Sequence, residues 1–145
     1  MKKFLLLFTF LFLNISFGQK ITTTYYFIRH AEKVDSSKNP DLSPRGMERA
    51  EHWNKIFAEV DFDLVYTTDF KRTVQTASPT AKAKKNTVKI YDPKNIAIES
   101  FKKETLGKKV LIVGHSNTIP NFVNQMINEK HTKTLAIQRL GIFIL

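Results

Sequence analysis

Short apolar segments alternate along the chain with longer segments whose apolar residues recur every three or four positions. The four apolar segments are Tyr25–Ile28, Leu64–Tyr66, Val88–Tyr91 and Val110–Val113. Such runs predict buried strands, and the stretches between them predict helices. The alternation indicates an α/β fold, a three-layer sandwich with a mainly parallel sheet and helices on both faces. Right-handed crossovers then align the carboxyl ends of the strands along one edge, where ligands of such sheets bind.

The first helical segment is LSPRGMERAEHWNKIFAEV, residues 42–60. Ser43 is a favourable N-cap, and Pro44 suits the first helical position. Gly46 is a poor helix former in the first turn, which indicates close packing against another segment. The apolar stripe expected to face the core consists of Met47, Ala50, Trp53, Phe57 and Val60.

Three more helices are predicted. The second begins near Asp69, carries Arg72 in its first turn and is interrupted by Pro79. The third covers NIAIESFKKETL (95–106), and the fourth starts after HSNT (115–118). Two segments stay ambiguous at this point. The polar loop KVDSSKNPD (33–41) either folds over a site or extends into solvent. The tail TLAIQRLGIFIL (134–145) is either a last strand or an early end of the chain.

The beginning of the chain carries a targeting signal. A basic start, MKK, precedes the apolar run at residues 4–17, and SFG at 16–18 supplies small residues. This order predicts a secretory signal peptide over residues 1–18. The run is shorter than the roughly 20 residues of a membrane span, although an uncleaved anchor is the alternative. We therefore expect residues 19–145 to form one domain that is periplasmic or secreted, without a stable membrane anchor after cleavage.

The amino-acid composition excludes several kinds of catalytic and metal site and limits the expected partners. The 145 residues include no Cys, which excludes disulfides, thiol catalysis and Cys-based zinc sites. The formal net charge of +10 is spread over many lysines, as expected for a solvated basic surface that attracts anionic substrates. Nucleic-acid binding is the other interpretation. The lysine-rich stretches lack the interleaved aromatic residues of single-strand binders, so we expect no nucleic-acid partner.

Two predicted strands end in the same way. YYFIRH ends at His30, and VLIVGH ends at His115. A single histidine at such a place is usually a surface residue, but two at matching positions should lie together at one edge of the sheet. Arg29 precedes the first histidine, and Arg72 lies at a helix N-terminus, where backbone N–H groups and a guanidinium both attract anions.

This set of side chains suits phosphoryl transfer. Guanidinium groups match the oxygens of a phosphoryl group, and a histidine can attack phosphorus and hold a covalent intermediate. Two neighbouring guanidinium charges oppose protonation of an imidazole, so the histidine would stay neutral and nucleophilic. Spacing alone does not prove this mechanism.

Four segments together, FIRHAEK, LSPRGMERA, VYTTDFKRTVQTA and VLIVGHSNT, resemble the histidine phosphatase superfamily, whose fold is called phosphoglycerate mutase-like. That family shows Arg-His-Gly/Ala after the first strand, then Leu-Ser/Thr-x-x-Gly, Ser/Thr-x-x-x-Arg-x-x-Gln-Thr-Ala and a later Gly-His. The resemblance implies that His30 is the nucleophile that becomes phosphohistidine and that Arg29 and Arg72 bind the phosphoryl oxygens. It also implies that His115 donates to the phosphoryl group, and that hydrolysis needs no metal or organic cofactor.

The chain departs from the family pattern at the general acid. Many members place a Glu after the third strand, where the nearest carboxylate here is Asp92, which equally suits a turn before Pro93. Glu32 is the other candidate acid, although it could instead orient Arg29 or Lys33. After the second histidine, Asn117 is a candidate phosphate ligand, with helix capping favoured for it and for its neighbour Ser116.

The sequence therefore predicts a metal-independent phosphatase that hydrolyses phosphomonoesters and meets a small phosphorylated substrate. A binding module of the same fold, weak or inactive in catalysis, is the first alternative, because fold does not guarantee chemistry. A protein phosphohistidine phosphatase is the second, which an export signal disfavours.

Overall fold

In the computed structural model, the described residues are 21–128 and 142–144. They form a five-stranded sheet in the order β3-β2-β4-β1-β5. β1 to β4 run parallel, and β5 pairs antiparallel with β1. The predicted α/β fold with a mainly parallel sheet is confirmed. The strands are β1 Thr24–Arg29, β2 Leu64–Thr67, β3 Val88–Ile90, β4 Lys109–Gly114 and β5 Ile142–Ile144.

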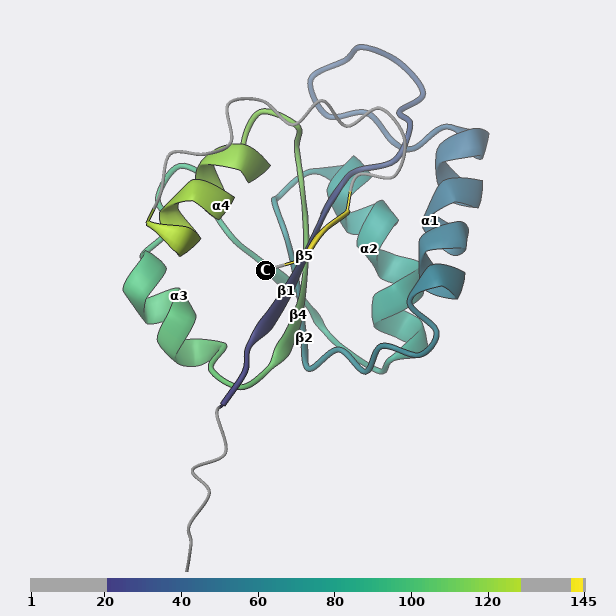
Figure 1. Ribbon diagram of the computed structural model, residues 1–145. Coiled ribbons are helices and arrows are strands. Elements are labelled where there is room, and N and C mark those ends of the chain that lie inside the picture. The colour runs from purple at the N-terminus through teal and green to yellow at the C-terminus, as the bar shows by residue number, and fades with distance from the viewer. Residues whose placement is uncertain (1–20, 129–141, 145) are drawn as a thin grey trace, which may run out of the picture.

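Two pairs of helices sandwich the sheet (Figure 1). α1 (Pro44–Ile56) and α2 (Lys71–Ala83) cover one face, and α3 (Ile98–Glu104) and α4 (Ile119–Ile127) cover the other. This is the three-layer arrangement that the strand and helix pattern predicts. Within the described ranges, no helix combines the length and the apolar character needed to cross a membrane.

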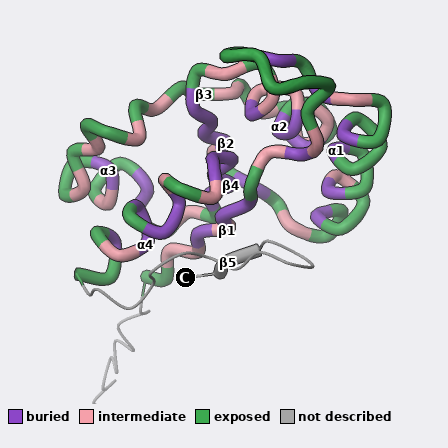
Figure 2. The backbone as a smooth tube through the Cα atoms, turned by 90° about the horizontal axis from the view of Figure 1, so that it is seen from above, coloured by how far each residue is buried: buried purple, intermediate pink, exposed green. Residues whose placement is uncertain are grey.

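The sheet separates two hydrophobic clusters. On the α3–α4 side, Phe27 and Ile112 pack with Phe122, and on the α1–α2 side Ile28 packs with Trp53 and Ala77. Figure 2 shows β1, β2 and β4 as buried tubes between helices whose outer faces are exposed. Because β1 and β4 bury side chains on both faces, their backbones are held by packing from two sides as well as by hydrogen bonds.

The first helix begins as predicted. Ser43 is the N-cap, and its side chain accepts a hydrogen bond from the Gly46 backbone N–H at 3.1 Å. A Cβ at Gly46 would lie 2.1 Å from the Glu32 carbonyl oxygen, so only glycine fits where α1 crosses the end of β1. Met47 was expected in the core, but its side chain is exposed. The apolar stripe begins one turn later, at Ala50, because the first turn of α1 contacts the loop rather than the sheet.

The second helix agrees with its predicted start and differs at Pro79. It begins at Lys71, near the expected Asp69, because Phe70 has an extended backbone and acts as N-cap. Pro79 lies inside the helix, which continues to Ala83. A proline removes one backbone donor, and the buried Ala77 and Ala81 on either side of it pack against the sheet, which holds the helix together.

Both ambiguous segments now have a place. In the tail, residues 142–144 form β5, so the interpretation as a sheet strand is confirmed for these residues. The loop after β1 is closed by a bridge between Lys33 and Leu42 and lies at the carboxyl ends of the parallel strands. The predicted signal peptide over residues 1–18 lies outside the described residues, and the division into a signal and a domain stays a prediction.

Candidate active site

The two predicted histidines lie side by side. β1 and β4 are neighbours, and the His30 backbone N–H donates to the Gly114 carbonyl at 3.0 Å, as the last hydrogen bond between the two strands. The rings of His30 and His115 are 5.3 Å apart between centroids and inclined at 66°. The parallel register therefore brings together two side chains that are 85 positions apart in the sequence.

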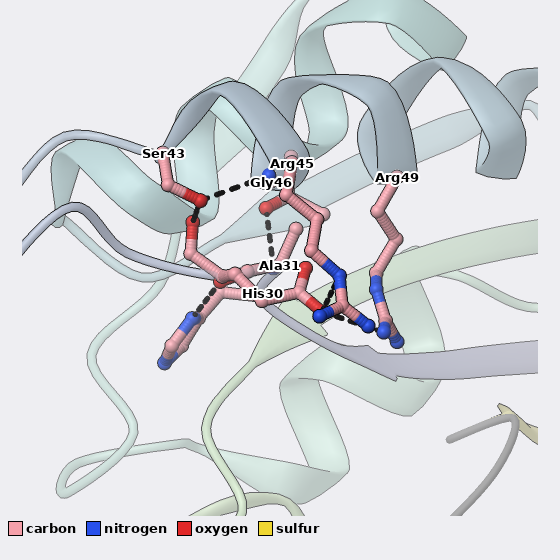
Figure 3. Close-up of polar contacts among 8 residues, drawn as sticks. His30, Ala31, Ser43, Arg45, Gly46 and Arg49 are labelled. Carbon is pink, nitrogen blue, oxygen red and sulfur yellow. Dashed lines mark hydrogen bonds and ion pairs between the residues drawn. The ribbon is translucent and has the colours of Figure 1, made fainter.

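The His30 ring is held in one protonation form by its own backbone. Its Nδ1 lies 2.7 Å from the Ala31 carbonyl oxygen. A carbonyl oxygen only accepts, so Nδ1 carries the proton and Nε2 keeps its lone pair in the neutral ring. Figure 3 shows the ring pointing away from Arg45 and Arg49, which lie on the opposite side of this segment. His30 thus has one ring nitrogen available to attack.

His115 is fixed from a different direction. Its Nε2 lies 2.9 Å from the Thr68 hydroxyl, which is also 3.1 Å from the Thr73 hydroxyl. The Thr73 hydroxyl donates in turn to the backbone at the start of α2. All three side chains are buried. The polar network sets the orientation of the His115 ring from the end of β2.

Both arginines act electrostatically on the histidine pair. Arg29 is exposed at the end of β1, and Arg72 is half-buried in the first turn of α2. The Arg72 guanidinium lies 4.3 Å above the ring of Phe70, and that ring contacts His115 at 5.1 Å between centroids. Phe70 thereby links a cation to the second histidine by a cation–π contact.

The lowered pKa values of both histidines favour their neutral forms at neutral pH. Burial lowers the pKa of His30 to about 4, and the charges of Arg29, Arg72 and Lys33 act in the same direction, against the bond to Ala31 that raises it. Burial likewise lowers the pKa of His115 to about 4, with the Arg72 charge next. At neutral pH both imidazoles are uncharged, so a lone pair is present at the site beside cationic arginines.

The two candidate general acids, Asp92 and Glu32, make their contacts away from the histidine pair. Asp92 is exposed and accepts hydrogen bonds from the Lys94 backbone and the Asn95 side chain, which hold its pKa below the usual range. A carboxyl group that favours its ionised form is a poor proton donor. This is the geometry of a turn residue.

Glu32 faces α1 instead of the histidines. Its Oε1 lies 2.6 Å from Arg49 Nη2 and 3.8 Å from Arg45 Nε. The expectation that it could orient Arg29 or Lys33 is therefore wrong: its partners are the arginines of α1.

The segments around the pair are also fixed. Arg72 Nη1 lies 3.5 Å from the Lys38 carbonyl, the Lys71 backbone donates to Asn39, and Gln75 accepts from the Leu42 backbone. The loop after β1 is thus bound over the first turns of α2. On the other side, Asn117 is exposed in the turn after His115. The predicted capping by Asn117 or Ser116 is wrong, because Thr118 is the N-cap of α4.

Sequence reasoning missed the residues that support the pair. Thr68 and Thr76 both belong to the motif that pointed to Arg72, so their positions were marked while their roles were not. Phe70 and the Ala31 carbonyl carried no signal in the residue types alone. Among residues 21–128 and 142–144, no three side chains are grouped so as to hold a metal ion.

Comparisons with known proteins agree with this fold. The model of the histidine phosphatase superfamily (branch 1) matches residues 25–93. The chain resembles phosphoserine phosphatase of Entamoeba histolytica in complex with 3-phosphoglyceric acid, with a TM-score of 0.64 and 16% identity over 85% of this chain and 90% of that one. No curated protein matches the chain.

Two further solved structures share the fold. SixA of Agrobacterium tumefaciens, assigned by name as a phosphohistidine phosphatase, has a TM-score of 0.57 and 22% identity over 72% of this chain and 77% of that one. Alpha-ribazole phosphatase of Shigella flexneri has a TM-score of 0.58 and 16% identity over 73% and 80%. The family match confirms, over residues 25–93, the resemblance to the histidine phosphatase superfamily that the four motifs carry, and the solved structures share the fold.

Proposed function

We propose that this chain is a phosphatase that hydrolyses phosphomonoesters through a phosphohistidine intermediate on His30, without a metal ion. The observation that carries the proposal is the state of the His30 ring. It is bonded through Nδ1 to the Ala31 carbonyl and lies beside His115 at the ends of two parallel strands, and burial lowers its pKa to about 4, which favours the neutral ring at neutral pH. A neutral imidazole with a free Nε2 lone pair is a competent nucleophile.

In the first step, His30 Nε2 attacks phosphorus and forms a P–N bond. The bond from phosphorus to the leaving oxygen breaks, its electron pair stays on that oxygen, and the oxygen takes a proton from solvent. Arg29, Arg72 and His115 donate to the peripheral phosphoryl oxygens. Donors that are already in position when charge develops usually make the largest contribution to such a reaction.

In the second step, water attacks phosphorus and forms a new P–O bond. The P–N bond breaks, its electrons return to Nε2, and the proton of the water passes to solvent. Inorganic phosphate leaves and His30 is neutral again. Because Asp92 and Glu32 are both engaged with other partners, we expect substrates whose leaving groups need no protonation to react fastest.

The test is hydrolysis of p-nitrophenyl phosphate, whose leaving group is stable as an anion. We expect turnover that EDTA does not reduce and that His30→Ala abolishes, while the matched control His52→Ala, at an exposed position of α1, keeps it. Acid-quench labelling with a ³²P substrate should trap phosphohistidine in the wild type only. A folded wild type that binds phosphate without turnover would replace the proposal with a binding module.

A second candidate is a protein phosphohistidine phosphatase. Within residues 21–128, no carboxylate contacts the histidine pair, and this favours the second candidate, because imidazole leaves phosphorus without needing a strong acid. Comparing turnover of a phosphohistidine peptide and of a phosphoserine peptide separates the two candidates. A turnover at least about tenfold higher with the phosphohistidine peptide would favour the protein phosphohistidine phosphatase.

We also propose that the chain is exported and acts on small phosphorylated substrates in the periplasm or outside the cell. The basic start and apolar run within residues 1–18 support this. Expression of the full chain with a C-terminal tag, followed by fractionation and N-terminal sequencing, tests it. A product that begins near Gln19 outside the cytoplasm is expected, and an intact product in the cytoplasm would overturn the proposal.

A further inference from the structure

The segment that follows β1 is tied at three successive residues to three different elements. The His30 backbone N–H donates to Gly114 of β4 at 3.0 Å. The Ala31 N–H donates to the Thr76 hydroxyl of α2 at 2.9 Å. The Glu32 carbonyl accepts from the Ser43 N–H at the start of α1 at 2.8 Å. Of these three bonds, only the middle one depends on a side chain.

The Thr76 hydroxyl is used in both directions. It accepts from the Ala31 N–H and donates to the Arg72 carbonyl at 2.6 Å. A hydroxyl has one proton, so donation to Arg72 directs a lone pair toward Ala31. The side chain is 1% exposed, so water does not compete for these bonds. A single buried oxygen thereby joins the backbone beside the nucleophile to the backbone of a phosphate-binding arginine.

From this arrangement we propose that Thr76 is a positioning residue for catalysis, and the proposal rests on the proposed function of His30. The Ala31 N–H and carbonyl belong to successive peptide groups, so fixing the first restricts where the second points. That carbonyl accepts from His30 Nδ1 and leaves Nε2 free. Thr76, 45 positions away in the sequence, therefore fixes both the tautomer of His30 and the direction in which its Nε2 points.

A buried threonine in a helix often bonds to the carbonyl four residues earlier and does nothing else. Thr80 lies one turn further along α2 and is equally buried, yet its hydroxyl has no hydrogen-bond partner among the described residues. The bond from a distant chain segment therefore distinguishes Thr76 from its neighbour. Thr80 provides a matched control of the same type, helix and burial.

The experiment compares Thr76→Val, Thr76→Ser and Thr80→Val with p-nitrophenyl phosphate. We expect Thr76→Val to lower kcat about 10- to 100-fold, because small displacements of a reacting group have effects of that size. KM should change less than about threefold, because the arginines remain. Thr76→Ser and Thr80→Val should stay within about threefold of the wild type. Equal kcat in the two valine variants would overturn the proposal.

A structural measurement keeps the proposal separate from the proposed function. ¹⁵N NMR of labelled histidine should show His30 as the Nδ1–H tautomer in the wild type and a mixture with Nε2–H in Thr76→Val. This result is informative even where the wild type has no turnover, in which case the proposed function alone fails. An unchanged tautomer in a folded Thr76→Val would contradict the positioning role. If that variant does not fold, Thr76→Cys, with a weaker acceptor, makes the same comparison.

Discussion

The carboxyl ends of β1 and β3 hold equivalent places in the parallel sheet, yet they support different structures. β1 lies between β4 and β5, and the residues after it are tied to three elements. Among the described residues, β3 pairs only with β2 and lies at an edge of the sheet, and Asp92 beyond it is exposed in a turn that satisfies its own carboxylate. A strand end positions a reactive group rigidly only where neighbouring segments restrain it on several sides.

We expect the largest loss of activity from a substitution at His115, which follows the interior strand β4. His115→Gln removes the second ring beside His30, and we expect kcat with p-nitrophenyl phosphate to fall about 10²- to 10³-fold, the range seen when one preorganised donor is lost. The glutamine side chain keeps a similar reach and polarity, so circular dichroism should report an unchanged fold. A decrease below threefold would mean that the contact between the two rings has no catalytic role.

The fit between α1 and the end of β1 should be the next most sensitive feature. Gly46→Ala places a methyl group where the Glu32 carbonyl oxygen lies, and a backbone atom must move to admit it. We expect a loss of about 1–3 kcal/mol in the free energy of unfolding, measured by urea denaturation. Gly107→Ala is not a matched control, because that glycine has a positive φ. Ala58→Gly, at an exposed site just after α1, tests a glycine exchange outside the fit and should change stability by less than 1 kcal/mol.

The two histidines at the ends of β1 and β4 should make stability depend on pH. Their pKa values near 4 lie below the ordinary 6.5, so the unfolded chain takes up protons at a higher pH than the folded chain does. The free energy of unfolding should therefore fall as the pH drops from 6.5 to 4 and level off below that. Melting temperatures at pH 7.5 and 4.5 measure this. The decrease should shrink in His30→Gln and persist in His52→Gln, and an equal decrease in both would refute the assignment.

We expect the smallest effect on activity from a substitution at Asp92, which lies beyond the edge strand β3. Asp92→Asn keeps the shape of the turn and removes only a carboxylate that is hydrogen-bonded to Lys94 and Asn95. We expect kcat and KM to stay within about threefold of the wild type. The comparison is most informative with a phenyl phosphate series of rising leaving-group pKa. If Asp92→Asn loses activity in proportion to that pKa, the carboxylate reaches the leaving group during turnover and the contrast between the two strand ends is wrong.

The sequence predicted those parts of the molecule that depend on periodicity and on local caps. Strand positions, the cap at Ser43 and the close approach at Gly46 follow from short-range rules. The pairing of His30 with His115 also followed, because parallel strands align their ends. Pro79 and Met47 were misjudged because tertiary packing, not local propensity, decides where a helix continues and which turn faces the core.

The partners of polar side chains were largely beyond sequence reasoning. Glu32 meets Arg49 because α1 lies across the end of β1, and Thr76 meets Ala31 because α2 packs against that point. Such contacts depend on the angle at which two elements pack, and this angle cannot be inferred from the residue types of the sequence. The motif that contains Thr68, Arg72 and Thr76 marked where to look without stating which atoms would bond.

The pairing of β1 also constrains the order in which the molecule can fold. Its hydrogen-bonded neighbours are residues 109–114 and 142–144, both far downstream. No strand within residues 21–100 pairs with it, so the segment that carries His30 cannot be paired until most of the chain has been synthesised. Loops of that length slow productive folding. If the chain is exported as proposed, an interior strand that cannot pair early would help to keep the chain unfolded until it crosses the membrane.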